Sequence, residues 1–264
     1  MNLETVYKAA LGIVYQYIPN MLKVITEKDF KNFILKSIEH TNIDGRGGTP
    51  NLNFIASFFM LIEASRTGKN DIIIKEFEYF NYLLGEFIKL NSNQKEFKNL
   101  VMASLMNFNK EAAFLEVLGE VGACLSLARE NIFEKYEYSL PNNKSIDLKF
   151  ETKFGVRLVE VSNIQYKAEK YEGSDSFKVF MHRRLKTKFE EKSKGLDKEY
   201  MDLIFIYPII HGISNEIIKD NHDLLKNLNE NTEFNCYEPC FFGNIQGTFF
   251  KLFSVDEVCK LPNP

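Results

Sequence analysis

The chain has 264 residues, of which 45% are hydrophobic and 26% are charged. This composition excludes an intrinsically disordered protein, because it supplies enough apolar surface for one large domain or two modest ones. No apolar run approaches the roughly 20 residues needed to cross a bilayer, so we expect no membrane contact.

The net charge of −3 is unevenly distributed along the chain. Residues 140–195 carry 13 Lys and Arg against 8 Asp and Glu, whereas residues 196–264 carry 5 against 11. A basic stretch on an acidic chain favours an anionic partner that meets one face of the protein. An ordinary solvated surface would give the same counts, and charge alone does not separate the two interpretations.

The four cysteines are Cys124, Cys236, Cys240 and Cys259. They contain no CxxC pair, and the N-terminus has no secretory signal, so the sequence predicts a reducing, cytoplasmic compartment. The last three could form a zinc site with His211 and His222, but the spacing fits no usual zinc finger. Burial as small hydrophobic side chains is the favoured role.

Before residue 110 the apolar residues recur at helical spacing, from Tyr7 to Ile18 and again from Phe30 to Ile38. Glu76–Leu90 and Lys95–Phe108 predict further helices. The segment Asp44–Pro50 is rich in glycine and could cradle a phosphate before a helix that Thr49 caps. It lacks the Gly-Lys-Ser/Thr ending of a P-loop, so a plain connector between helices is favoured.

This helical half has more apolar aromatic residues than a lone small bundle needs, notably Phe54, Phe58, Phe59, Phe77, Tyr79 and Phe80. They predict a homodimer formed through the helical region. The alternative is that they pack within one continuous core against the helix of residues 111–131.

After residue 110 helical and strand periods alternate. A helix is expected over residues 111–130, where Gly119, Gly122 and Ala123 would let it lie close against a sheet. The remaining expected elements, in order, are strands over 133–140, 145–150 and 156–162, a helix over 177–189, a strand over 201–207, a helix over 215–231 and a strand pair over 234–242 and 248–255. We therefore expect an α+β fold, with an all-helical domain over residues 1–110 and a mixed central sheet flanked by helices over residues 111–264.

Two carboxylates fall on neighbouring strands of this second domain. Asp147 shares a face of its strand with Lys149, and Glu160 shares a face of the next strand with Ser162. Carboxylates at such positions are costly unless they meet positive charge, and a divalent metal ion is one source of it.

The order of helix, three strands, helix and strand, with Asp147 on the second strand and Glu160-Val161-Ser162 on the third, resembles the PD-(D/E)XK nuclease superfamily. The resemblance covers residues 111–207 and implies a restriction-endonuclease-like core. It also implies Mg²⁺ (or Mn²⁺) held by Asp147, Glu160 and the carbonyl of Val161. A helical acid, Glu120 or Glu116, would complete the site.

In that superfamily a lysine follows the second acid by two residues, and this chain has Ser162 there. Lys149 could deliver an ammonium from the neighbouring strand, or metal-bound water alone could be acidic enough. A third alternative is an inactive site in a fold retained for binding. Asp147, Glu160, Lys149 and Ser162 are therefore the candidate catalytic positions.

The expected helix after the third strand is strongly basic, and Lys178, His182, Arg183 and Lys186 are candidates for phosphate contact. A solvated helix face is the alternative interpretation. Together these features predict a metal-dependent endonuclease that acts on DNA in preference to RNA, with restriction or defence against phage as a setting. The second hypothesis is a catalytically inactive nuclease-like fold that serves as a nucleic-acid or protein interaction module.

Overall fold

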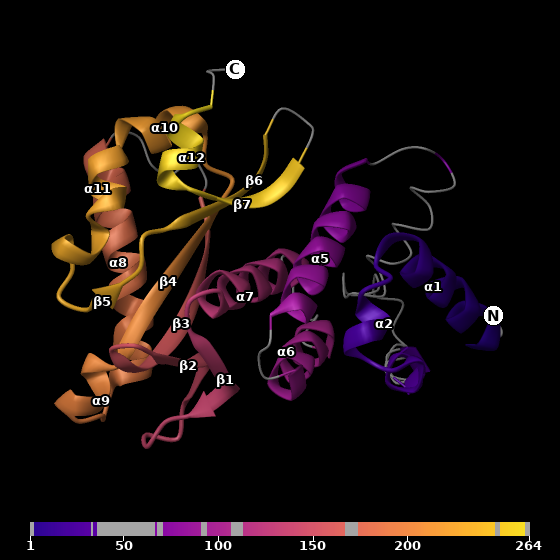
Figure 1. Ribbon diagram of the computed structural model, residues 1–264. Helices are drawn as coiled ribbons and strands as arrows, with labels where there is room; N and C mark the ends of the chain where they lie inside the picture. The colour runs from indigo at the N-terminus through magenta and orange to yellow at the C-terminus, as the bar shows by residue number, and fades with distance from the viewer. Residues whose placement is uncertain are drawn as a thin grey trace, which may run out of the picture. The chain divides into compact units, whose positions relative to one another are not determined.

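The computed structural model describes residues 3–32, 34–35, 67, 71–90, 94–106, 113–166, 174–245 and 249–261. It divides into two compact units, Met1–Val121 and Gly122–Pro264. The expected α+β class is confirmed, with a helical N-terminal region and a mixed sheet flanked by helices (Figure 1).

The first unit consists of helices where it is described. The helices whose bounds are described are α1 (Leu3–Tyr17), α2 (Met21–Val24), α5 (Asp71–Lys89), α6 (Gln94–Met106) and the beginning of α7 (Ala113–Ala128), and residues 27–32 and 34–35 are also helical. Helix α1 ends two residues before Pro19, because a proline cannot continue the helical hydrogen bonds. The core of this first unit contains many aromatic side chains. The rings of Phe87 and Phe97 stack there with centroids 3.4 Å apart.

The aromatic residues expected at a dimer interface are buried where the structure describes them. Phe77 and Phe80 have no exposed surface, and Tyr79 is 9% exposed. These three side chains therefore cannot form the surface that a second copy would meet. Phe54, Phe58 and Phe59 lie outside the described residues, as does the glycine-rich segment 44–50.

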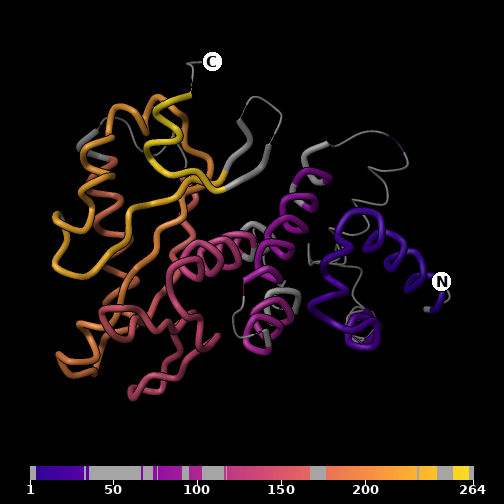
Figure 2. The backbone as a smooth tube through the Cα atoms, viewed as in Figure 1, coloured from indigo at the N-terminus to yellow at the C-terminus, as the bar shows by residue number. Residues whose placement is uncertain are grey.

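The second unit is built on one mixed sheet. Among the described residues its strands are β1 (Ile132–Ser139), β2 (Ser145–Thr152), β3 (Gly155–Gln165), β4 (Ile204–His211), β5 (Asn235–Cys236), β6 (Cys240–Ile245) and β7 (Phe249–Ser254). The order is β1-β2-β3-β4-β6-β7, and β5 pairs with β4 beyond one end of β6. The first three strands form an antiparallel meander (Figure 2), whereas β3 and β4 are parallel.

Helix α8 (Ser174–Ser193) supplies the crossover that a parallel pair of strands requires, and it packs against β3 and β4. Phe177, Met181 and Leu185 point from α8 into the core of this face, which also receives Ile204 and Ile206 of β4. The remaining helices are α9 (Lys198–Asp202), α10 (Asn215–Asp220), α11 (His222–Lys226), a 3₁₀ turn over Leu228–Asn231 and α12 (Val255–Cys259).

The C-terminal half of α7 belongs to this unit and approaches β7 closely. A Cβ atom added to Gly122 would lie 2.3 Å from Cδ1 of Leu252. A larger residue at position 122 would therefore require the Leu252 side chain to move, so the small residue permits this close approach, as expected from the sequence of the helix.

The expected strand over residues 201–207 is wrong at its start. Met201 and Asp202 end helix α9, which Asp197 caps by accepting a hydrogen bond from the Tyr200 backbone N–H. The strand begins at Ile204 and extends to His211.

Two expectations near the C-terminus are also wrong in detail. The single helix over residues 215–231 is two short helices interrupted at Asn221, followed by the 3₁₀ turn. The strand over 234–242 is split into β5 and β6, and the next strand ends at Ser254. Ser254 and Glu257 form a capping box that starts α12 at the following residue.

Cys124 and Cys236 are buried, which confirms their role as small core side chains. Within the described ranges, no helix is long and apolar enough to cross a membrane.

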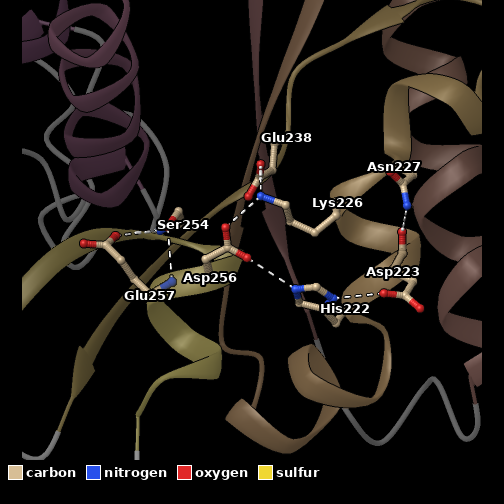
Figure 3. Close-up of polar contacts among 8 residues, drawn as sticks. All are labelled: His222, Asp223, Lys226, Asn227, Glu238, Ser254, Asp256 and Glu257. Atoms are coloured by element: carbon tan, nitrogen blue, oxygen red, sulfur yellow. Dashed lines mark hydrogen bonds and ion pairs between the residues drawn. The ribbon is translucent and has the colours of Figure 1, made fainter.

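A polar cluster joins α11 to α12 and to the segment that precedes β6 (Figure 3). His222 lies between two carboxylates, with Nδ1 3.0 Å from Asp223 Oδ1 and Nε2 3.3 Å from Asp256 Oδ1. Lys226 donates to Glu238 and to Asp256 at 2.9 Å each. The hydrogen bond to Asp223 and then that to Asp256 raise the pKa of His222 above its usual 6.5, while Lys226 and then His222 lower the pKa of Asp256.

This cluster predicts a pH-dependent contribution to stability. Because the folded pKa of His222 is raised, its contribution is fully present below the unfolded pKa of about 6.5 and is lost as the pH rises through the folded pKa. The contribution of Asp256 is present above the unfolded value and is lost as the pH falls through the lowered folded one. We expect His222→Gln to lower the free energy of unfolding more at about pH 5.5 than at about pH 8.5. Urea unfolding at both pH values measures this, with His182→Gln as the control, and equal losses at the two pH values would contradict it.

Candidate functional site

Glu160 is the most deeply buried carboxylate of the described part of the sheet, at 2% exposure. It lies on β3 beneath α8. Lys192 Nζ lies 3.0 Å from its Oε2, and Lys188 Nζ lies 3.4 Å from its Oε1. The two lysines are four residues apart, so one face of α8 brings both ammonium groups to the same carboxylate. Two cations thus offset the cost of removing this anion from water.

Asp147 reaches the same part of β3 from β2. The antiparallel pairing of β2 with β3 ends at Leu148 and Val159, so Asp147 and Glu160 are the first residues beyond it on their strands. Asp147 Oδ2 then accepts a hydrogen bond of 2.8 Å from the Val161 backbone N–H. Where β2 and β3 separate, the carboxylate of Asp147 thus accepts the hydrogen bond that a backbone carbonyl of β2 would otherwise accept from the Val161 N–H.

The carbonyl of Val161 faces the same edge. On β3 the backbone N–H of Leu158 bonds to Leu203, and that of Tyr166 bonds to His211, so the even-numbered residues of β3 pair with β4. The N–H and C=O groups of one strand residue point to the same side. Since the N–H of Val161 meets Asp147, its carbonyl oxygen also points toward β2.

Ser162 is buried, and it follows Glu160 on the same face by strand alternation. Its hydroxyl oxygen has no hydrogen-bond partner within the described ranges. A hydroxyl group supplies no positive charge, so any cation at this site comes from another element.

Lys149 is engaged along β1. Its ammonium lies 2.8 Å from Glu134 Oε2 and 5.1 Å from the centroid of the Tyr138 ring. The hydrogen bond to Glu134 raises the pKa of Lys149. The structure therefore places this ammonium at Glu134 and places those of Lys188 and Lys192 at Glu160.

The sequence contains a signal for these two lysines. Phe177, Met181 and Leu185 form the apolar stripe of α8, and continuing it by three and then four residues reaches positions 188 and 192. Lysines at positions that should face the sheet indicate a buried anion beneath them. The total number of basic residues in α8 does not distinguish these two lysines from those on its exposed face.

The remaining candidate residues lie elsewhere. Glu116 and Glu120 belong to the first unit, whereas Asp147 and Glu160 belong to the second. Lys178, His182 and Arg183 line a hollow of about 260 Å³ between α8 and α11, with Leu224 and Leu228 on the other side. Lys186 lies 3.9 Å from the carboxylates of both Glu190 and Glu233.

Within the ranges described, no three His, Cys, Asp or Glu side chains gather in a group that could hold a metal ion. The possible donors at the β2–β3 edge are two carboxylates and one backbone oxygen. All are oxygen atoms, the ligand type that Mg²⁺ and Mn²⁺ prefer. One of them, Glu160 Oε2, is buried without a well-formed hydrogen bond although an ammonium lies nearby. The chemical types of these donors therefore suit a hard divalent cation.

Comparison with known proteins gives no relative: no family model, no curated protein and no solved structure matches this chain.

The ion pairs at Glu160 predict a measurable loss when one ammonium is removed. Lys192 also donates to the Ser145 carbonyl at 2.7 Å. We expect Lys192→Met to lower the free energy of unfolding by about 1.5–3 kcal/mol, because hydrogen bonds to charged groups contribute roughly that amount. Urea unfolding measures the change.

Lys194→Met is the matched control, because Lys194 is exposed just beyond the end of the same helix. Combining Lys192→Met with Glu160→Gln should give a coupling energy of about 1 kcal/mol or more. Strictly additive losses would show that the two side chains do not stabilise one another.

Proposed function

We propose that this chain is a metal-dependent nuclease with a PD-(D/E)XK-like core, hydrolysing phosphodiester bonds of DNA in preference to RNA. The observation that carries the proposal is the edge between β2 and β3. Asp147 accepts a hydrogen bond from the backbone N–H of Val161, the residue that follows Glu160, and two ammonium groups of α8 reach Glu160. The order of α7, an antiparallel β1-β2-β3 meander, α8 and a parallel β4 supports the same assignment.

Asp147, Glu160 and the Val161 carbonyl would hold Mg²⁺ or Mn²⁺ in this proposal. The metal would lower the pKa of a bound water and neutralise charge that develops on the phosphate.

The missing lysine at Ser162 has two candidate replacements. Lys188 and Lys192 already lie at Glu160, so their ammonium groups are available beside the proposed metal ligands. Lys149 would have to leave Glu134 to reach the same place. A fixed cation beside the reacting phosphate stabilises the charge that forms in the transition state. The geometry favours the α8 lysines in this role.

Phosphate groups of the substrate would contact the exposed part of α8. Lys178 and Arg183 are exposed, and with His182 they line the hollow beside α11. Such contacts position a backbone without reading its sequence. Lys186 would also contact a phosphate if its ammonium moved away from the carboxylates of Glu190 and Glu233.

A second candidate function is a nuclease-like fold without catalysis that binds nucleic acid or protein. Both oxygens of Glu160 already have ammonium partners, and one oxygen of Asp147 already accepts a hydrogen bond. These contacts neutralise or satisfy the two carboxylates without a metal, and this arrangement favours a purely structural role for the edge.

Cleavage of supercoiled plasmid DNA and of RNA in Mg²⁺ or Mn²⁺ separates the two functions. We expect Asp147→Asn and Glu160→Gln to lower the metal-dependent cleavage rate by about 10²-fold or more, with Glu151→Gln on β2 as the matched control. Lys192→Met should lower the rate more than Lys149→Met does. Mn²⁺ should also raise the melting temperature of the parent protein and not that of Asp147→Asn. If the parent protein neither cleaves nor responds to Mn²⁺, the binding function replaces the nuclease.

A further inference from the structure

A second cavity lies on the opposite face of the sheet from Glu160. Its volume is about 510 Å³, within the range of small-molecule sites. Arg157 of β3 points into it, and because Arg157 and Glu160 are three residues apart on one strand, they face opposite sides. The cavity is bounded by the end of α7, by the turn between β2 and β3, and by the segment that precedes β6.

Aromatic rings and cations share one side of this cavity. The Arg157 guanidinium lies 4.5 Å from the Phe205 ring centroid and donates a 3.0 Å hydrogen bond to the Tyr237 hydroxyl. At the rim, Phe154 is 78% exposed, and the Lys153 ammonium lies 4.9 Å from its ring centroid. An aromatic ring this exposed on a strand turn, flanked by cations, presents a surface on which a planar group can stack.

Neither cation of this cavity forms an ion pair with a carboxylate among the described residues; their recorded partners are aromatic rings and the Tyr237 hydroxyl. Lys153 and Arg157 are therefore available to an anionic group. Phosphate suits them, since a guanidinium can bind two of its oxygens at once.

The other side of the cavity offers hydrogen-bond acceptors. Glu238 lines it, and while its Oε2 accepts from Lys226 at 2.9 Å, its Oε1 is buried without a hydrogen-bond partner (Figure 3). The carboxylates that line this side of the cavity can accept hydrogen bonds from a ligand N–H or O–H. Glu130 adds a second carboxylate to the lining. A bare polyanion would be repelled by these two groups.

A nucleotide matches all three features. Its base can stack on Phe154, its phosphate can meet Lys153 and Arg157, and a base amine or sugar hydroxyl can donate to Glu238. We propose that this cavity binds one nucleotide unit, either free or at the end of a strand. The proposal goes beyond nuclease activity and does not rest on it, because the cavity uses none of the residues at the β2–β3 edge.

Isothermal titration calorimetry tests this with adenosine monophosphate, adenosine, inorganic phosphate and a 5′-phosphorylated oligodeoxynucleotide as probes. The buffer contains EDTA, so that the proposed metal site contributes nothing. We expect adenosine monophosphate or the oligonucleotide to bind more tightly than adenosine or phosphate. Preference for the mononucleotide identifies a free ligand, and preference for the oligonucleotide identifies a strand end.

Phe154→Ala and Lys153→Ala should each weaken that binding by about fivefold or more, since base stacking and phosphate contact are each lost. Both side chains are exposed, so these variants retain the fold. Lys198→Ala, an exposed lysine on α9, is the matched control and should bind as the parent does. Absence of binding by both nucleotide probes, or binding that both cavity variants leave unchanged, overturns the proposal.

Discussion

The arrangement of the second unit depends on the buried carboxylate of Glu160 and the two ammonium groups that reach it. A carboxylate at 2% exposure in the middle of a sheet is strongly unfavourable by itself. Lys188 and Lys192 satisfy it only while α8 lies across β3 in one register. Removing one partner of such a group leaves charge without compensation, whereas an apolar contact would tolerate sliding. The ion pairs therefore fix the position of α8 more specifically than its apolar stripe does.

The same end of α8 also holds the hairpin between β1 and β2. Asn142 donates to the Lys192 carbonyl at 2.7 Å, Lys144 donates to the Glu191 carbonyl, and Lys192 donates to Ser145. These contacts hold β2 beside α8 just before Asp147, where β2 separates from β3. The candidate site and the attachment of the hairpin are thus parts of one polar network. Changes at Lys192 affect both, and this is why a matched control on the same helix is needed.

Strand alternation explains why β3 contributes to two different surfaces. Glu160 and Ser162 face α8, while Arg157 faces the cavity on the other side. One side combines carboxylates with ammonium groups, and the other combines cations with aromatic rings and an unsatisfied acceptor.

The sequence predicts the elements of the second unit well where the period is clear. The alternation around Asp147 places β2 within two residues of its observed end, and the four-residue repeat from Phe177 locates α8. The prediction of the β4 strand fails at Met201. The apolar pattern assigns this residue to the strand, but Met201 belongs to the end of helix α9, which Asp197 caps.

The site is predicted less completely. Asp147 and Glu160 follow from local spacing, and the pairing of β2 with β3 confirms that they occupy neighbouring strands. Lys149 follows from the same local rule, but its contact with Glu134 depends on a bulge in β1 that spacing does not reveal. Lys188 and Lys192 depend on a helix more than 25 residues away in sequence that folds back over β3. Only a tertiary contact brings them to Glu160.

The proposed nuclease function requires that the β2–β3 edge hold a divalent metal beside the α8 lysines. Anomalous diffraction from crystals soaked in Mn²⁺ tests it most directly. We expect one anomalous peak within bonding distance of Asp147, Glu160 and the Val161 carbonyl, with the Lys188 and Lys192 ammonium groups displaced from Glu160 only as far as the ion requires. A fully soaked crystal without a peak there, and with both lysines still paired to Glu160, would contradict it.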